Sequence, residues 1–308
     1  MLGLPSLWCL SLLLGAAARP APARPVAAEP VAQAPAPIVQ ETQTWHDKRV
    51  SRLMAEDGWL SLVGLHWLQV GDNTVGSDVA SAVRLPASAP RQVGSLMLSK
   101  EGKVSFEVAS GVALLRQGEP FAGGKVLTDA LGEPDVFRLG TVRFMVIRRG
   151  ARTAVRVKDS EAETRKRFRG IPRYVPRAAW RVDAHFEPSV SPRRILVPNI
   201  LGETEDMMYP GALTFTLDGK KYRLDPVIEE GENQLFIIFG DETNHTDTYH
   251  SGRFLSAAMP VNGHVILDFN RAYNPPCAFT AYATCPLPPP QNRMETRVEA
   301  GEKRYPAR

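Results

Sequence analysis

The sequence predicts a mainly β protein, with an N-terminal sandwich-like half joined by a short helix to a C-terminal β-barrel-like half. Apolar residues alternate with polar ones in several short stretches, such as Val104–Val108 and Val142–Val146. Glycine-containing turns separate these stretches, and no long helical pattern occurs in residues 180–269. Short strands at such spacing are typical of sandwiches and barrels.

The first 43 residues differ in composition from the rest of the chain. Residues 1–18 are predicted to be a signal peptide, because Leu7–Ala18 is apolar and ends in three alanines. The apolar run is too short to span a bilayer. Residues 19–43, rich in Pro and Ala, are predicted to form an extended spacer. We therefore expect export to the periplasm or the extracellular space. A wrongly assigned start codon or a disordered tail is the alternative.

Two helices are predicted. Residues 44–158 form the N-terminal half with a leading helix, which Thr44 caps together with Asp47. Residues 159–308 form the connecting helix and the C-terminal half. In the connecting helix Ser160 is the expected cap and Glu163 completes the capping box, while Gly170 ends the helix.

The C-terminal half contains five predicted strands, at residues 195–197, 213–217, 221–224, 234–239 and 264–269. Asp218-Gly219 lies between the second and third of these strands. Asp-Gly favours the two-residue turn that matches strand twist, so a β-hairpin is expected there.

One N-terminal stretch resembles a known family of domains. Leu68–Asp78, with its Gly-Asp-Asn-Thr-Val-Gly run, is similar to the opening of forkhead-associated domains. The resemblance implies a similar sandwich. Those domains carry a Ser and a His in a loop after the second strand, and Gly94–Met97 has no His. Phosphothreonine binding is therefore not expected. A generic Gly-rich hairpin is the alternative.

A dense polar motif follows the last predicted strand. Within Asp268–Cys277 it places these residues: Asp268, Asn270, Arg271, Tyr273, Asn274 and Cys277. Each polar group needs a partner if it is buried, so packing alone rarely requires this mixture. The motif is the strongest indication of a site.

The same motif resembles a prokaryotic family known as domain of unknown function 1684. Gly252–Leu255, Asp268–Cys277, Cys285-Pro286 and Gln291–Arg293 carry the resemblance, and further matches extend it over about Trp45 to Tyr305. These further matches are Gly58-Trp59-Leu60, Arg167–Pro172 and Tyr209-Pro210-Gly211. The resemblance implies a shared fold and a shared site, and it supplies no activity.

Cys277 and Cys285 are candidates for a disulfide, as expected for an even cysteine pair in an exported protein. If residues 278–284 form a straight strand, the two cysteines lie roughly 26 Å apart and cannot bond. If the segment folds back as a loop, the bond is feasible. Buried free thiols, a metal site or a nucleophile remain the alternatives.

An enzymatic reading uses Cys277 as nucleophile. It needs a base, for which His250 is the candidate alongside His245 and His264, and Asn270 or Asn274 would be the oxyanion donor. The structural alternative is a buried cysteine with hydrogen-bonded histidines.

The run Asp241–His250 follows the most apolar strand. Asp241 and His245 are of the right types to bind a divalent metal, but no recognised metal spacing is present. A polar turn is the alternative, in which Asp241 pairs with Arg253.

Seven positive charges lie between Arg165 and Arg181. We expect them to bind carboxylates such as Glu203, Glu205 and Asp206 rather than nucleic acid, because the pI of about 9.0 and net charge of +4 are modest. Binding of phosphate, lipid headgroups or an acidic ligand is the alternative.

The predicted function is binding of a small anionic ligand in a polar pocket of the C-terminal half. Arg253 and Arg271 are the expected anchors, and the orienting groups are Asp268, Asn270, Tyr273 and Asn274. The alternatives are a hydrolase using Cys277 or a metal-bound water, and a structural protein in which the motif latches the C-terminal tail. No cofactor and no membrane span are predicted, and the oligomeric state is left open.

Overall fold

The computed structural model describes Leu2 and residues 37–306, and all statements below concern these residues. The predicted signal peptide and most of the predicted spacer lie outside the described residues. Ala36–Arg308 forms one compact unit. Within it, one hydrophobic core lies in the N-terminal half and another in the C-terminal half.

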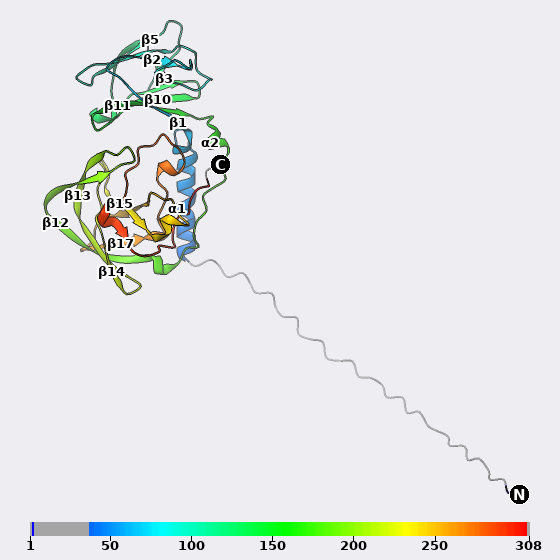
Figure 1. Ribbon diagram of the computed structural model, residues 1–308, viewed down its shortest axis with the longest axis vertical. Helices are drawn as coiled ribbons and strands as arrows, with labels where there is room; N and C mark the ends of the chain where they lie inside the picture. Colours follow the sequence, from blue (N-terminus) through cyan, green and yellow to red (C-terminus); the bar gives the residue numbers. More distant parts are fainter. Residues whose placement is uncertain (1, 3–36, 307–308) are drawn as a thin grey trace. The chain divides into compact units, whose positions relative to one another are not determined.

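The leading helix begins earlier than predicted. α1 spans Pro37–Met54, so Thr44 lies inside it and donates from Oγ1 to the Gln40 carbonyl at 3.0 Å instead of capping. Proline is well suited to the first helical position. The helix also buries Thr42 and His46 against the rest of the chain, which extends it through residues assigned to the spacer. Figure 1 shows α1 in blue beside the C-terminal strands.

The N-terminal half is a sandwich of two sheets. The six-stranded sheet has the order β1-β11-β10-β9-β6-β7, and the five-stranded sheet has the order β3-β2-β4-β5-β8. The bounds are β1 Leu62–Trp67, β2 Gly71–Gly76, β3 Val83–Arg84, β4 Gly94–Leu98, β5 Val104–Val108, β6 Leu115–Arg116, β7 Glu119–Pro120, β8 Gly123–Val126, β9 Val136–Leu139, β10 Val142–Arg149 and β11 Arg152–Asp159. The sandwich-like prediction is confirmed.

The sandwich core is built from alternating residues of both sheets. Phe106 of β5 and Phe144 of β10 are almost fully buried, with ring centroids 6.0 Å apart. Phe137 of β9 packs edge-on against Phe106 at 5.6 Å. The likeness to forkhead-associated domains stays a prediction, and Gly94–Met97 lies in strand β4 rather than in a loop.

The connecting helix is shorter than predicted. α2 covers only Glu163–Lys166, and its N-cap is Ala162 without a side-chain cap. Ser160 does not cap, because β11 continues through Asp159 and the Ser160 N–H donates to the Thr141 carbonyl at 3.1 Å. Glu163 and Arg167 form an ion pair one turn apart, at 2.9 Å.

The C-terminal half contains two further sheets. One has the order β14-β13-β12-β17, and the other has the order β16-β15-β18. The bounds are β12 Arg181–Pro198, β13 Thr204–Leu217, β14 Lys220–Leu224, β15 Gln234–Asp241, β16 Arg253–Ala258, β17 His264–Asp268 and β18 Arg293–Met294. Seven 3-10 turns complete the described elements: η1 Trp59–Ser61, η2 Asp129–Leu131, η3 Ala178–Trp180, η4 Glu242–His245, η5 Phe269–Arg271, η6 Pro276–Ala278 and η7 Pro290–Asn292.

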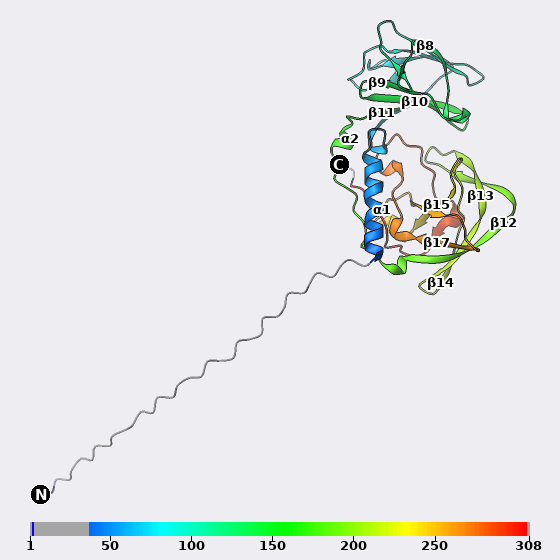
Figure 2. The same ribbon diagram turned by 180° about the vertical axis from the view of Figure 1, so that it is seen from behind.

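The five predicted C-terminal strands fall on these sheets, but the last one ends at Asp268, one residue earlier than predicted, because Phe269 begins η5. The predicted hairpin is confirmed, since Leu217 pairs with Lys220 and both Asp218 and Gly219 have positive φ, at 49° and 78°. Figure 2 shows the long β12–β13 ribbon from behind. No sheet within residues 37–306 closes into a barrel, so the barrel-like prediction is not confirmed.

In the part of the chain that the structure describes, no helix is both long enough and apolar enough to cross a membrane.

Candidate functional site

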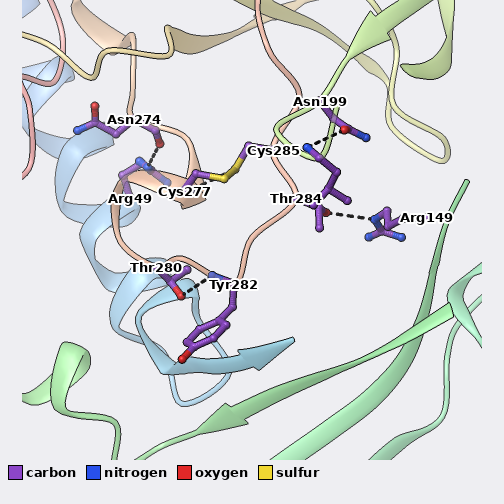
Figure 3. The surroundings of a disulfide bond; sticks show 10 residues. Arg49, Arg149, Asn199, Asn274, Cys277, Thr280, Tyr282, Thr284 and Cys285 are labelled. Atoms are coloured by element: carbon purple, nitrogen blue, oxygen red, sulfur yellow. Dashed lines mark hydrogen bonds between the residues drawn. A yellow bond between two sulfur atoms is a disulfide. The ribbon is translucent and has the colours of Figure 1, made fainter. Parts of the chain in front are cut away.

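Cys277 and Cys285 form a disulfide (Figure 3), with their Cα atoms 6.2 Å apart. The segment between them folds back, because Pro276–Ala278 forms η6 and the Tyr282 N–H donates to Thr280 Oγ1 at 3.2 Å. Of the alternatives that the sequence left open, the structure has the disulfide. Cys277 therefore has no thiol to act as nucleophile, and His250 has no cysteine to activate.

Arg253 does not face a ligand pocket, which corrects its expected role as an anchor. Its side chain is fully buried and donates to the Asp241 carboxylate at 2.6 Å. It also donates to the main-chain carbonyls of Val298, at 2.9 Å, and Ala300. The structure therefore contains the Asp241–Arg253 pair, which was the alternative to a metal site at Asp241.

The run after β15 is a capped turn rather than a metal centre. Asp241 accepts from the Thr243 N–H at 2.8 Å, and its own N–H donates to Asn244 Oδ1 at 2.7 Å, which makes a capping box for η4. His245 and His250 are exposed. Among the residues described, no three His, Cys, Asp or Glu side chains are grouped to hold a metal. Asp241 and His245 therefore lack the further ligands that a metal site needs.

Asp268 and Asn270 bind the chain that enters β12. Asp268 accepts from Arg181 at 2.9 Å, and the Asn270 side chain bonds both the N–H and the carbonyl of Arg177 at 3.0 Å. Both side chains are buried. They are occupied by protein partners, so they do not orient a ligand here. Arg181, from the basic run, binds carboxylates, but its partners are Asp268 and, at 2.6 Å, Glu41 instead of the expected Glu203, Glu205 or Asp206.

Asn274 binds the C-terminal segment, residues 295–305. Its N–H donates to the Glu302 carboxylate and its Nδ2 donates to the Lys303 carbonyl, both at 2.8 Å. Glu302 also accepts from Arg49 at 3.0 Å, and Glu302 is only 1% exposed. These contacts are those of a latch between α1, the polar motif and the chain end.

Two motif residues, Arg271 and Tyr273, do line a cavity. This arginine cavity has a volume of about 230 Å³ and is lined by Trp45, Arg49, Arg52, Gln234, Ser256, Arg271 and Tyr273. Three of the seven residues are arginines and none is a carboxylate. Such a lining favours an anion by charge.

The helix side of the cavity was missed at the sequence level. Trp45, Arg49 and Arg52 are spaced i, i+4 and i+7, which places them on one face of α1. Gln234 and Ser256 come from the paired strands β15 and β16. The spacing of these three residues indicates that they share one helix face, but nothing in the local sequence indicates that this face contacts Ser256.

Residues 166–303 match the family model described as a protein of unknown function (DUF1684). The chain belongs to this family. An uncharacterized protein of Haloarcula marismortui, solved in solution by NMR, is 31% identical to the chain. That similarity covers 45% of this chain and 78% of the other, with a TM-score of 0.39. No curated protein matches the chain.

The DUF1684 match contains one side of the arginine cavity and not the other. Gln234, Ser256, Arg271 and Tyr273 fall within residues 166–303, as does the disulfide. The α1 side of the cavity and the N-terminal sandwich lie outside the matched residues, which are fewer than the expected Trp45 to Tyr305. One wall of the cavity in this DUF1684 chain therefore comes from residues that match the family model, and the other wall comes from α1, which precedes them.

A second cavity adjoins the first in the DUF1684 chain. This aromatic cavity, of about 500 Å³, also has Arg49, Arg52 and Tyr273 in its lining, together with Ala55, Asp57, Trp59, Glu229, Phe236, Phe254 and Pro276. Phe236 and Phe254 meet edge-to-face at 4.9 Å, and Phe254 and Tyr273 do so at 5.8 Å. These three rings form a continuous aromatic wall. Burial raises the pKa of Tyr273 above its usual value.

A third cavity, of about 630 Å³, shares Trp59, Phe236 and Phe254 with the aromatic cavity. Its lining also includes Arg149, Arg156 and Cys285. Burial, with Arg149 nearby, lowers the pKa of Arg156 to about 10, which leaves the guanidinium charged at neutral pH.

Proposed function

We propose that this protein binds a small anionic ligand in the arginine cavity. The observation that carries the proposal is the lining itself, three arginines with no carboxylate among the seven residues. The proposal keeps Arg271 and Tyr273 from the sequence-based prediction. It replaces Arg253 by Arg52 as an anchor.

The three arginines differ in how far their charge is already neutralised. Arg49 pairs with Glu302 and donates to the Asn274 carbonyl, so it is held in place by the protein. Arg271 lies between two carboxylates, with its Nε 3.4 Å from Asp268, which it shares with Arg181, and its terminal nitrogen 3.8 Å from Glu41. Arg52 forms no ion pair with any residue in 37–306. Arg52 therefore has its full charge available for a ligand, Arg271 contributes the charge that its partners leave, and Arg49 shapes the cavity.

Neutral polar groups complete the lining. Ser256 and Gln234 can donate or accept, and the raised pKa of Tyr273 keeps its hydroxyl protonated at neutral pH. A carboxylate or phosphate oxygen bound by guanidinium groups would meet further donors here. Charge-assisted hydrogen bonds of this kind are about twice as strong as neutral ones.

The direct test is calorimetric titration of the protein with acetate and with inorganic phosphate, beside the Arg52→Gln variant. We expect saturable binding that Arg52→Gln weakens by roughly tenfold, the loss of one charge-assisted bond. Arg84→Gln is the matched control, because Arg84 is exposed on β3 and lines none of these cavities. Equal affinity in Arg52→Gln and in the control would contradict the proposal.

A structural role for the rest of the polar motif is favoured by separate contacts. Asp268, Asn270 and Asn274 each bond to protein groups within the described chain, and Asn274 reaches Glu302 and Lys303 near the chain end. The motif would thus serve both ligand binding and stability. Arg271 and Tyr273 line the cavity, while the other three residues hold the chain together. The hydrolase alternative has no support here, because Cys277 is bonded to Cys285.

We also propose that the protein is exported. The support is the apolar Leu7–Ala18 run and the Cys277–Cys285 disulfide, a bond typical of oxidising compartments. N-terminal sequencing of the protein recovered from cell fractions tests this. A start near residue 19 in the periplasmic or culture fraction is expected, and an intact Met1 in the cytosolic fraction would contradict it.

A further inference from the structure

We propose that the anion bound in the arginine cavity is amphipathic, a carboxylate whose uncharged apolar body lies in the adjoining aromatic cavity. This inference rests on the proposed function and specifies its ligand class. It starts from the two cavities being contiguous, because Arg49, Arg52 and Tyr273 line both of them. A ligand held by Arg52 thus lies beside the second space.

The sizes of the two spaces support a ligand that occupies both. The arginine cavity, at about 230 Å³, is smaller than the usual small-molecule site of roughly 300–1,000 Å³. The aromatic cavity, at about 500 Å³, lies within that range. A lone acetate would leave the larger space without a ligand group.

The walls of the larger space are suited to an apolar body. Phe236, Phe254 and Tyr273 form one continuous wall of edge-to-face rings. Trp59 and Pro276 contribute further apolar surface. Apolar groups gain free energy when they leave water for such a surface, roughly in proportion to the area buried.

The charges in the aromatic cavity argue against a second negative group on the ligand. Asp57 and Glu229 both belong to its lining. Desolvation and the nearby carboxylates of Glu232 and Glu205 raise the pKa of Glu229, so this region already disfavours negative charge. A dicarboxylate is therefore a poorer fit than a carboxylate with a neutral body.

Calorimetric titration with acetate, butyrate, hexanoate and octanoate tests the inference. Affinity should increase by about fourfold for each methylene that becomes buried, and Arg52→Gln should weaken octanoate as well as acetate. Ala55→Phe, at the residue that follows α1, fills the aromatic cavity and should remove the gain with chain length while keeping acetate binding. Ala80→Phe, at an exposed position in the N-terminal half, is the matched control.

The possible outcomes separate this inference from the proposed function. If acetate binds but affinity does not rise with chain length, the arginine cavity binds anions, and the inference that the ligand has an apolar body is wrong. If adipate or 6-aminohexanoate binds more tightly than hexanoate, the body is charged and the inference is also wrong. If none of the anions binds, both proposals fail. If octanoate binds equally to Arg52→Gln, its binding is apolar only and the inference fails.

Discussion

Arg253 and Asp241 form an ion pair at 2.6 Å in which both side chains are completely shielded from solvent. The pair joins the start of β16 to the end of β15. Through the carbonyls of Val298 and Ala300, the same guanidinium holds the C-terminal segment. A buried pair of this kind is expensive to break from one side, because the remaining charge loses its partner.

We expect Arg253→Met to destabilise the protein by about 3–5 kcal/mol, since Asp241 is left buried and unpaired. The double variant with Asp241→Asn should recover part of this loss, because no lone charge remains. Urea unfolding followed by circular dichroism measures both. The exposed pair Arg91–Asp78 is the control, and Arg91→Met should have a far smaller effect. A loss of equal size in both single variants would contradict this account.

Glu302 couples the chain end to α1 and to the polar motif. Glu302→Ala leaves the Arg49 guanidinium and the Asn274 N–H without their acceptor, and we expect a loss of about 1–3 kcal/mol. The effect should be local first. The amides of Glu302, Lys303 and Arg304, which donate to other parts of the chain, should exchange faster with solvent.

Hydrogen exchange read by mass spectrometry checks this prediction. The neighbouring exposed pair Arg297–Glu299 offers the control variant Glu299→Ala, which should leave the exchange of residues 302–304 unchanged. Faster exchange throughout the protein in Glu302→Ala, with no excess at the chain end, would mean that Glu302 is not a local latch.

Features specified by local chemistry were predictable from the sequence. Asp218-Gly219 encodes its turn through positive φ at both positions, and the alternating strands of both halves encode one buried face. The start of α1 was not predictable in this way. Its first turns are supported by distant partners, such as Arg181 bound to Glu41 and Arg173 bound to Gln43.

In the candidate site, too, local features were predictable from the sequence and long-range contacts were not. The sequence indicated that the polar motif needs partners, but it could not assign them. Asn274 and Arg253 find partners at positions 298–303, and Arg271 instead faces the cavity beside Arg52, more than 200 residues away in the sequence. Which polar residue is latched and which is left for a ligand depends on these long-range contacts.

Stability should fall between neutral and mildly acidic pH because of two histidines. Burial lowers the pKa of His46, with Arg173 nearby, and burial likewise lowers the pKa of His66, below the ordinary value of 6.5. As pH falls through 6.5, the unfolded chain takes up protons that the folded protein does not bind. The stabilisation is therefore complete above 6.5 and decreases below it, by at most about 1.4 kcal/mol per pH unit for each histidine.

Urea unfolding at pH 7.5, 6.5 and 5.5 measures this slope. His46→Gln and His66→Gln should each flatten it, even if they change stability at pH 7.5. His245→Gln, at an exposed position, is the control and should retain the slope. Stability that rises on acidification over this range in the unmodified protein would contradict the prediction.

The disulfide closes a loop between two cysteines with a sequence separation of 8. The Cys285 carbonyl accepts from the Ile200 N–H, which ties this loop to the residues that follow β12. Chain-entropy arguments give about 2.5 kcal/mol for a loop of this length. We expect dithiothreitol to lower the free energy of unfolding of the wild-type protein by about this amount. The double variant Cys277→Ala/Cys285→Ala should be less stable by a similar amount and should not respond to dithiothreitol. Where Cys9 is retained, it is retained in both proteins, so any response that it causes would appear in the double variant as well. The opposite result would be a wild-type protein whose stability does not change with the reductant and whose Cys277 and Cys285 titrate as two thiols after denaturation. That result would show that the bond does not form in solution, and Cys277 would again be a candidate nucleophile.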